Sequence, residues 1–330
     1  MVISNTNQIK KANTAAVRKV LNGEHGTTIA EIVRGTGLSV PTVSRIIEEM
    51  ISRSEALSCP EEIATGGRRA RQYRLNGSYC YLLCIYFNRK TLWYDLCDAV
   101  GNSVNAEEIA VCGDDHSNTI HQLIHRIQEE YPALRAVSIG VPAWVDHDEL
   151  RLIHEYPGFD LHNFRREIEK KFHLPCRITN DLKAIAAGYY SSHFPDKKIS
   201  LCCIYLSDSG PGAGVIVNGS LLPGKAGFAG EIGYLPFGKG TLRDALTPEM
   251  PDSIRKEAAT AAAMAMITLL NPDYLLFCTY GGRMPPVREI VADCRKKLPE
   301  EALPQFIETD DYHHYFLSGL RSIAEKIALH

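Results

Sequence analysis

The sequence predicts an α/β protein with a small helix-turn-helix unit at its N-terminus, followed by a two-lobed α/β body. Two short amphipathic helices separated by a glycine-containing turn occupy residues 27–57. From residue 79 onwards, strand-like and helix-like segments follow in two successive sets, with glycine-rich loops at several strand ends. The length of 330 residues exceeds what one hydrophobic core usually serves, so two or three domains are expected.

The two N-terminal helices have start and stop signals in the segment TTIAEIVRGTGLSVPTVSRIIEEMISRSEAL. Thr28 followed three residues later by Glu31 is a capping-box pattern, and Ser39 is the expected N-cap of the second helix. Gly35 and Gly37 are expected to break the first helix. The preceding stretch KKANTAAVRKVLNG predicts one more helix before this pair.

The second helix has one apolar and one polar face. The stripe predicted to be buried comprises Val40, Val43, Ile46, Ile47 and Met50. Short hydroxyl side chains and an arginine on the other face suit base edges and phosphates, so the predicted DNA-contacting residues are Ser39, Pro41, Thr42, Ser44 and Arg45. The pattern favours a helix-turn-helix with its second helix in the major groove; a helical hairpin used only for packing is the alternative.

A basic segment follows these helices. Residues 64–76 read ATGGRRARQYRLN and hold four arginines and no acidic residue. They predict a wing strand or an arm that places Arg68, Arg69 and Arg71 along a narrow minor groove. A flexible solvated linker is the open alternative for these side chains.

The net charge of −3 is unevenly distributed. Residues 1–78 hold eleven Lys and Arg against seven Asp and Glu, a net of +4, which leaves −7 for the rest of the chain. This modest asymmetry favours a polyanion, double-stranded DNA, as partner of the N-terminal unit only. Without an apolar run that could span a bilayer or a secretory signal, we expect a cytoplasmic protein with no membrane partner and with its ten cysteines reduced.

The body is predicted to be two α/β lobes with a cleft between them. In the first lobe, strands are expected in YCYLLCIYFNRKTLWYDLCDAVGNSV, RAVSIGVPAWVD and CRITND, and helices in LHNFRREIEKKFH and DLKAIAAGYY. The cycle restarts with ISLCCIYLSDSGPGAGVIVNGSLL, the long helix IRKEAATAAAMAMITLLN and the strand YLLFCTY. Glycines at 210, 212 and 214 have the spacing of a backbone loop that wraps a phosphate, although Asp208 places a negative charge beside them.

Several motifs together resemble the ROK family of repressors, open reading frames and sugar kinases. They are SIGVPAWVD, YPGF, LPCRITND, SGPGAGVIVNGSLL and above all GFAGEIGYLPFG, in the order and spacing of that family. The resemblance covers nearly the whole chain. Head and body together resemble the transcription-factor branch of the family. It implies a winged helix-turn-helix fused to a sugar-kinase-like body of the actin-like ATPase, or ribonuclease H-like, fold. The implied units are 1–76 for the winged helix-turn-helix and basic linker, 77–190 for the first lobe, 191–312 for the second, and a C-terminal helix, 313–330, that rejoins the first lobe.

The nucleotide-binding loops that the resemblance implies have diverged. Family kinases end the first strand of the body with D-x-G-x-T, where this chain reads YFNRK with Tyr86 and Asn88. Their G-T-G-x-G loop begins here with Asp208 and keeps Gly210 and Gly212. Like charges about 4 Å apart repel by about 4 kcal/mol at an effective dielectric of 20, so Asp208 would weaken triphosphate binding roughly a thousandfold unless a metal ion bridged the two charges.

The implied sugar-binding positions are partly retained. Asp181 matches the family's catalytic aspartate and Asn180 a sugar-binding neighbour, although both residue types also cap helices. Glu231 matches a hydroxyl-binding glutamate, and Gly158 a loop residue of the same pocket. Tyr234 stands where the family has a histidine that binds both sugar and zinc.

The zinc module C-x-C-G-x-x-G-C that follows in the family is missing. No cysteine lies between Cys203 and Cys278, and no histidine lies between His193 and His313. Without thiolate and imidazole ligands, tetrahedral zinc is not expected there, and no cofactor is expected in the chain.

These features predict a transcriptional regulator that has lost kinase chemistry, with a body that senses a sugar or sugar phosphate and forms a homodimer or homotetramer. Asp181 would then be a vestigial base that accepts a hydrogen bond from the ligand. Two alternatives stay open: an active kinase that phosphorylates a hexose with ATP, and a ligand-independent DNA-binding or scaffold protein.

Overall fold

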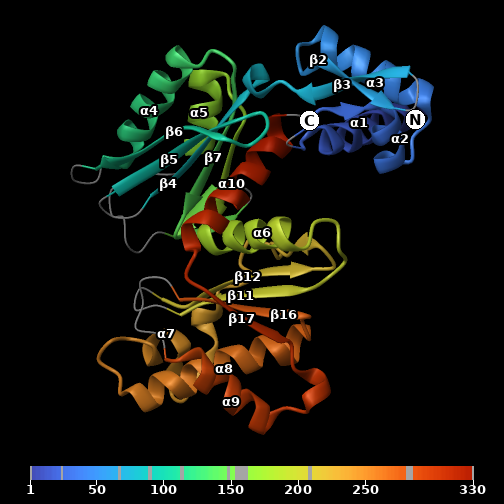
Figure 1. The fold of residues 1–330 in the computed structure, drawn as a ribbon. Coiled ribbons are helices and arrows are strands. Elements are labelled where there is room, and N and C mark those ends of the chain that lie inside the picture. Colours follow the sequence, from blue (N-terminus) through green and yellow to red (C-terminus); the bar gives the residue numbers. More distant parts are fainter. Residues whose placement is uncertain are drawn as a thin grey trace.

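Three parts follow one another along the chain in the computed structural model: a helical head and two sheets, each with its own helices (Figure 1). The structure describes residues 2–328 except 24, 66–67, 88–90, 112–114, 147–148, 153–162, 207–209 and 280–284, and it leaves out the side chains of 2–6, 60–65, 68–69, 87 and 149–152. No helix in these described ranges combines the length and apolarity that crossing a membrane requires.

The head packs three helices against a small antiparallel sheet. The helices are α1 (Val2–Leu21), α2 (Ile29–Thr36) and α3 (Val40–Ser52), and the sheet has the order β1-β3-β2, formed by β1 (Thr27–Thr28), β2 (Ala56–Thr65) and β3 (Arg68–Leu75). Residues of all three helices and of the hairpin β2–β3 share one buried cluster. Helices α2 and α3 with the hairpin after them have the arrangement of a winged helix-turn-helix, and residues 68–75 form a wing strand.

The capping box predicted at the start of α2 is confirmed. The Thr28 hydroxyl accepts from the Glu31 backbone N–H, and Glu31 accepts from the Thr28 backbone N–H. The predicted break at Gly35 is wrong, because α2 continues through it to Thr36 and ends at Gly37 in the left-handed region (φ 69°). A Cβ on Gly35 would lie 3.0 Å from a Val20 methyl carbon, so this glycine permits close packing of α2 on α1.

The first lobe is built on a five-stranded sheet of order β10-β7-β4-β5-β6. Strand β4 pairs antiparallel with β5 and parallel with β7, so a three-stranded meander continues into two parallel strands. The elements of this lobe are η1 (Gly77–Tyr79), β4 (Tyr81–Phe87), β5 (Thr91–Asp98), β6 (Ser103–Ala110), α4 (His116–Glu130), β7 (Leu134–Val141), β8 (Trp144–Asp146), β9 (Glu149–Leu152), α5 (Phe164–Phe172), β10 (Cys176–Asn180) and α6 (Asp181–His193).

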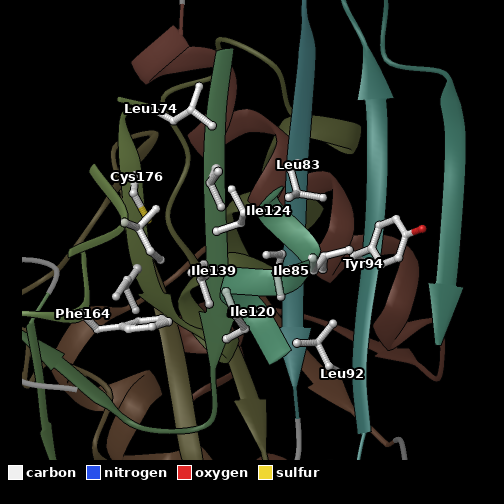
Figure 2. Close-up of a cluster of buried hydrophobic side chains, with 14 of the residues drawn as sticks. Leu83, Ile85, Leu92, Tyr94, Ile120, Ile124, Ile139, Phe164, Leu174 and Cys176 are labelled. Carbon is white, nitrogen blue, oxygen red and sulfur yellow. The ribbon is translucent and has the colours of Figure 1, made fainter. Parts of the chain in front are cut away.

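One face of this sheet packs against α4 and α5. Ile120 and Ile124 of α4 and Phe164 of α5 lie over Ile85 of β4 and Ile139 of β7 in a fully buried cluster (Figure 2). The sequence analysis did not predict α4.

The second lobe repeats the topology of the first. Its sheet has the order β13-β12-β11-β16-β17, again an antiparallel meander followed by two parallel strands. The elements are β11 (Leu201–Tyr205), β12 (Gly212–Val217), β13 (Ser220–Leu221), η2 (Ile232–Tyr234), β14 (Pro236–Phe237), β15 (Gly240–Thr241), α7 (Leu242–Ala245), α8 (Asp252–Leu270), β16 (Tyr274–Cys278), α9 (Val287–Lys297), η3 (Glu300–Ala302) and β17 (Gln305–Thr309). This doubled pattern is the predicted actin-like ATPase architecture; α9 and β17 were not predicted.

Two helices lie between the sheets and join the lobes. Helices α6 and α10 (Tyr312–Ala328) cross in the middle of the molecule, and α10 also packs on β4 and β7 (Figure 1). At the crossing, a Cβ on Gly188 would lie 1.9 Å from the Tyr315 carbonyl oxygen, and one on Gly319 would lie 1.9 Å from the Ala184 carbonyl oxygen. Backbones therefore approach there more closely than any side chain allows, and the buried cluster around them takes residues from both sheets.

Candidate functional site

A cavity of about 130 Å³ opens between the two lobes. Its walls come from the end of β7, the start of α6, the beginning of β12, the segment around η2, and α7. The described residues that line it include Asn180, Asp181, Gly210, Gly212, Glu231, Tyr234 and Arg243. An engineered protein cavity of about 150 Å³ binds benzene, so the volume is in the range of a small-molecule site.

Asn180 and Asp181 reach the cavity because β10 ends where α6 begins. The Asn180 side chain caps α6: its Oδ1 accepts from the Lys183 backbone N–H at 3.2 Å, and its Nδ2 donates to the Ala143 carbonyl oxygen at 3.1 Å. The capping role therefore uses both ends of the Asn180 amide. Asp181 is left as the first side chain of α6 beside the cavity, and its Oδ1 accepts from the Leu182 backbone N–H at 2.7 Å.

The carboxyl of Asp181 has an unusual proton affinity. Burial, together with the nearby Glu231 carboxylate, raises its pKa to about 7 against hydrogen bonds from the Leu182 and Asp181 backbone N–H groups and from Asn180, which lower it. Near neutral pH this group is therefore divided between a form that donates a hydrogen bond and one that only accepts.

Behind the cavity lies a buried lysine that the sequence analysis did not identify. Lys183 is 5% exposed and donates from Nζ to the Gly227 carbonyl oxygen. Burial lowers the pKa of Lys183, and Glu231 and Asp146 oppose that shift. In turn, burial raises the pKa of Glu231, against the attraction of Lys183 and then of Arg243. A lysine within the otherwise small and apolar run LKAIAAG was the signal in the sequence.

Aromatic rings form one wall of the cavity mouth. The ring of Phe228 lies 5.1 Å from that of Trp144 and 5.4 Å from that of Tyr234, measured between centroids, and Trp144 is held by a 2.6 Å hydrogen bond to the Ala226 carbonyl oxygen. Tyr234 is 51% exposed, and Cζ of the Arg243 guanidinium lies 5.7 Å from the centroid of its ring. Of these residues, the sequence analysis identified Tyr234 alone.

A second group of aromatic side chains fills the end of β4. Tyr86 is buried, its ring stacks on Trp93 at 5.2 Å, and its hydroxyl is 2.8 Å from Nδ1 of His313. Phe316 of α10 lies 5.0 Å from the same ring. The position at which the resembled kinases carry an aspartate is thus packed with aromatic rings. Asn88, two residues further on, lies outside the described residues.

The glycine-rich loop borders the same cavity from the second lobe. Gly210 has φ 124°, which favours glycine, and a Cβ there would lie 3.3 Å from Cζ of Arg243. Gly212 begins β12, and a Cβ on it would lie 2.5 Å from Cδ1 of Leu182. Two other predicted residues, Asp208 and Gly158, lie outside the described residues.

The donor set does not fit the zinc ion of the resembled kinases. At the position of the zinc-binding histidine, Tyr234 points its ring at Phe228 and Arg243 and offers no imidazole nitrogen. In the described part of the chain, no three His, Cys, Asp or Glu side chains are grouped as metal ligands.

In the head, the residues predicted to contact DNA lie at the surface of α3 and of the wing. Ser39, Pro41, Arg45 and Arg71 are exposed, whereas Thr42 and Ser44 are partly exposed. The side chains of Arg68 and Arg69 lie outside the described set.

Two details of α3 differ from the prediction. Ser39 is the N-cap residue, but its hydroxyl bonds to the Thr42 hydroxyl at 2.9 Å instead of capping a backbone N–H. Val40 was predicted to be buried and is 54% exposed, because it is the first residue of α3 and precedes the turn that packs on α2. Val43, Ile46, Ile47 and Met50 form the buried stripe as predicted.

The head rests on the first lobe and on the end of α10. Ala15, Arg18 and Lys19 of α1 face Glu325 and Lys326 of α10 across a shallow cavity. Val100, in the turn after β5, packs on the buried cluster of the head. Arg18 also bonds to the buried Glu55 at 2.7 Å, so the same arginine ties α1 to the start of the wing.

Residues 96–244 match the ROK family. The DNA-binding transcriptional dual regulator NagC of Escherichia coli K12 is 27% identical over 244 residues, which cover 71% of this chain and 59% of NagC. The chain therefore spans less than two thirds of that relative.

Two solved structures are similar in fold. A ROK family transcriptional regulator described as a homologue of the E. coli MLC protein has a TM-score of 0.77 at 19% identity and covers 97% of this chain and 98% of its own. A ROK hexokinase from Thermus thermophilus has a TM-score of 0.62 at 16% identity and covers 74% of this chain and 98% of its own. The regulator extends over the head and the body together, whereas the hexokinase covers about three quarters of the chain.

Proposed function

We propose that this chain, which carries a ROK family domain, is a transcriptional regulator that binds a DNA operator through its head and senses a sugar or sugar phosphate in the cavity between its lobes. The observation that carries the proposal is that an exposed helix-turn-helix is joined to a kinase-like body in which aromatic rings pack at the end of β4. Similarity to NagC supports the regulatory role, and similarity to a hexokinase supports a carbohydrate as the class of ligand.

The lack of catalysis is supported by the end of β4. Transfer of a phosphoryl group needs an open site for the nucleotide phosphates and their metal ion. Here Tyr86, Trp93 and His313 pack together at the end of the strand, and no carboxylate takes the position of Tyr86. We infer that Asp181 binds a ligand hydroxyl and does not act as a base in phosphoryl transfer, because the chain binds no phosphoryl donor.

Helix α10 is a candidate connection between cavity and head. Its first turn places Tyr312 near Asp181, since burial first and then the Asp181 carboxylate raise the pKa of that tyrosine. Its last turn places Glu325 near Arg18 of the head. A helix of 17 residues is about 25 Å long. Closure of the lobes on a ligand would therefore move α10 and the head together, and in a homodimer or homotetramer would alter the spacing of paired heads on DNA.

The experiment that tests the DNA-binding part is selection of DNA sequences with the purified full chain, followed by titration with salt. We expect a (pseudo)palindromic site with half-sites about one helical turn apart, bound selectively at physiological salt. Binding that is equally tight for all sequences would contradict the proposal.

A second experiment separates the regulator from its alternatives. Thermal unfolding is measured with a panel of sugars and sugar phosphates, with and without MgATP. Stabilisation by sugar alone is expected for the sensor, stabilisation that requires nucleotide would indicate a kinase, and no response would indicate a ligand-independent DNA-binding protein.

A further inference from the structure

A segment of the second lobe crosses to the first lobe beside the cavity. We propose that this segment, residues 223–230, is a strap that holds the two lobes together, and that Trp144 and Lys183 are the residues that position it. The inference goes beyond the proposed function, because it concerns how the wall of the cavity is held in place and requires no particular ligand.

Two side chains of the first lobe bind the backbone of the strap. Nε1 of Trp144, on β8, donates to the Ala226 carbonyl oxygen at 2.6 Å. Nζ of Lys183, on α6, donates to the next carbonyl oxygen along the chain, that of Gly227. An indole N–H and an ammonium can only donate, so both are suited to carbonyl acceptors. The strap is therefore held at two adjacent residues by two different elements of the first lobe.

Gly227 allows the strap to lie directly on β8. It has φ 68°, and a Cβ there would lie 1.9 Å from the Val145 carbonyl oxygen, which is closer than any side chain allows. The far end of the strap is bound to its own lobe, because the Ala213 backbone N–H of β12 donates to the Gly230 carbonyl oxygen at 2.8 Å. The strap thus connects the sheet of the second lobe to β8 and α6.

The position of the strap determines one wall of the cavity. Phe228 and Gly230 of the strap and Glu231 directly after it line the cavity. The ring of Phe228 meets that of Trp144 edge-on, with 5.1 Å between centroids. Burial raises the pKa of Glu231, and the largest opposing effect comes from the Lys183 ammonium. Loss of either anchor would therefore displace residues that line the cavity without removing any of them.

The test measures local opening of the strap in the full chain by hydrogen exchange with detection by mass spectrometry. In Lys183→Met the unbranched stem remains and the donor is lost. Loss of a hydrogen bond from a charged donor is expected to accelerate exchange of the amides of residues 223–231 by about 10- to 100-fold. The matched control is Lys170→Met, at an exposed lysine of α5, which should exchange as the unaltered chain does.

A second pair of variants displaces the strap without altering Lys183. Gly227→Ala and Gly238→Ala both place a Cβ on a residue of positive φ, 68° and 58°, so the backbone cost is shared. The Cβ at 227 would meet the Val145 carbonyl oxygen, whereas at 238 no atom of the described residues lies within 4 Å. We expect faster exchange over residues 223–231 in Gly227→Ala and unchanged exchange there in Gly238→Ala.

Tryptophan fluorescence distinguishes a positioning role from a general loss of stability. The chain has two tryptophans: Trp93, stacked on Tyr86 at the end of β4, and Trp144, bonded to the strap. Combined with Lys183→Met, the Trp93→Phe change leaves Trp144 as the only reporter, and Trp144→Phe leaves Trp93. Release of the strap should shift the emission of Trp144 to longer wavelength and increase its quenching by acrylamide, while the emission of Trp93 stays unchanged.

Three results would overturn the inference. Unchanged exchange over residues 223–231 in either Lys183→Met or Gly227→Ala would contradict the strap. Equal acceleration over the whole chain, or a shift of both tryptophans, would show that Lys183 only stabilises the fold. If Lys183→Met fails to fold, the comparison of Gly227→Ala with Gly238→Ala remains decisive. These measurements use neither DNA nor sugar, so failure of the strap leaves the proposed function standing, and failure of the proposed function leaves the strap standing.

Discussion

At the scale of single residues, Asn180 and Asp181 show that two adjacent side chains can have different roles. In the sequence, Asn180 and Asp181 are equally good candidates for a helix cap and for a ligand site. The structure divides the two roles: Asn180 caps α6 with its amide, and Asp181 borders the cavity with a raised pKa. The Asn180 cap fixes the start of α6, and the orientation of the Asp181 side chain toward the cavity therefore depends on Asn180.

The first prediction concerns the pH dependence of stability. The pKa of Asp181 is raised in the folded chain to about 7 from about 3.8, so folding favours the protonated form, and this contribution is full below about pH 4 and is lost as the pH rises to about 7. Asp181→Asn cannot lose a proton. Relative to the unaltered chain, we expect this variant to gain up to a few kcal/mol in free energy of unfolding between pH 4 and 7, reduced by solvent in the cavity.

The measurement is urea unfolding of both chains at several pH values. Asp310→Asn, at an exposed aspartate between β17 and α10, is the control and should show the same pH profile as the unaltered chain. A stability difference for Asp181→Asn that does not change between pH 4 and 7 would contradict the raised pKa.

At the scale of elements, α3 and the α6–α10 crossing carry the two functions of the proposed regulator. Helix α3 is anchored by its apolar stripe, which leaves its first turn and Arg45 free to approach DNA. Even the incorrectly predicted Val40 fits this geometry, since an exposed methyl pair at the start of the helix can contact a thymine methyl group.

The second prediction tests α3. Arg45→Ala is expected to weaken operator binding by about 1–3 kcal/mol, because a charged contact to a base or a phosphate is lost. Fluorescence anisotropy over a range of salt distinguishes the two contacts: loss of a phosphate contact lowers the salt slope by about one, whereas loss of a base contact relaxes sequence preference. Arg295→Ala on α9 is the matched control, and an equal effect of both variants would argue against the role of α3.

The third prediction tests the helix crossing. Gly188→Ala is expected to destabilise the chain by ~1–3 kcal/mol or more, because its Cβ would overlap the Tyr315 carbonyl and force α10 away from α6. Gly23→Ala is the control, since a Cβ there would lie 4.0 Å from the Val20 carbonyl oxygen, and its stability should stay within about 0.5 kcal/mol of the unaltered chain. Thermal unfolding of the three chains provides the comparison. Equal stability of both variants would mean that α6 and α10 can move apart at the crossing without a loss in free energy of unfolding.

At the scale of the whole molecule, α10 is an element that contacts the head at one end and lies near Asp181 of the cavity at the other. The head touches the turn after β5 and the last turn of α10, while Tyr312 in the first turn of α10 lies near Asp181. The exposed ion pair between Lys19 and Asp196 contributes little to this contact, because solvent screens surface pairs. The proposed control by an effector requires that these contacts change when a ligand binds.

The fourth prediction follows from thermodynamic linkage. If an effector weakens operator binding by a given factor, the operator must weaken effector binding by the same factor. Calorimetry of the effector with free and DNA-bound chain checks this equality, with DNA of unrelated sequence as the control. Unequal factors at equilibrium would mean that the effector acts through aggregation or a third component.

Sequence patterns predicted the head and the alternation of strands and helices in the body well, because these elements depend on local periodicity. The capping box at Thr28, the wing strand and most body strands need only neighbours within a few residues. Helix α4 also has helical periodicity in the sequence, because Ile120, Leu123, Ile124 and Ile127 lie on one face. The periodicity was therefore sufficient to predict this helix.

By itself, the sequence predicted most of the elements and their order, and the residues that resemble a kinase-derived sugar site. Tertiary structure alone decided which side chains share a cavity, since Asp181, Glu231 and Arg243 are brought together across two lobes from positions more than 60 residues apart at the extremes. It also decided that aromatic rings pack at the end of β4 and that Gly210 and Gly212 border the cavity between the lobes. The reason is that local propensity acts within a few residues, whereas burial, pKa and ligand shape depend on contacts made only when the lobes pack.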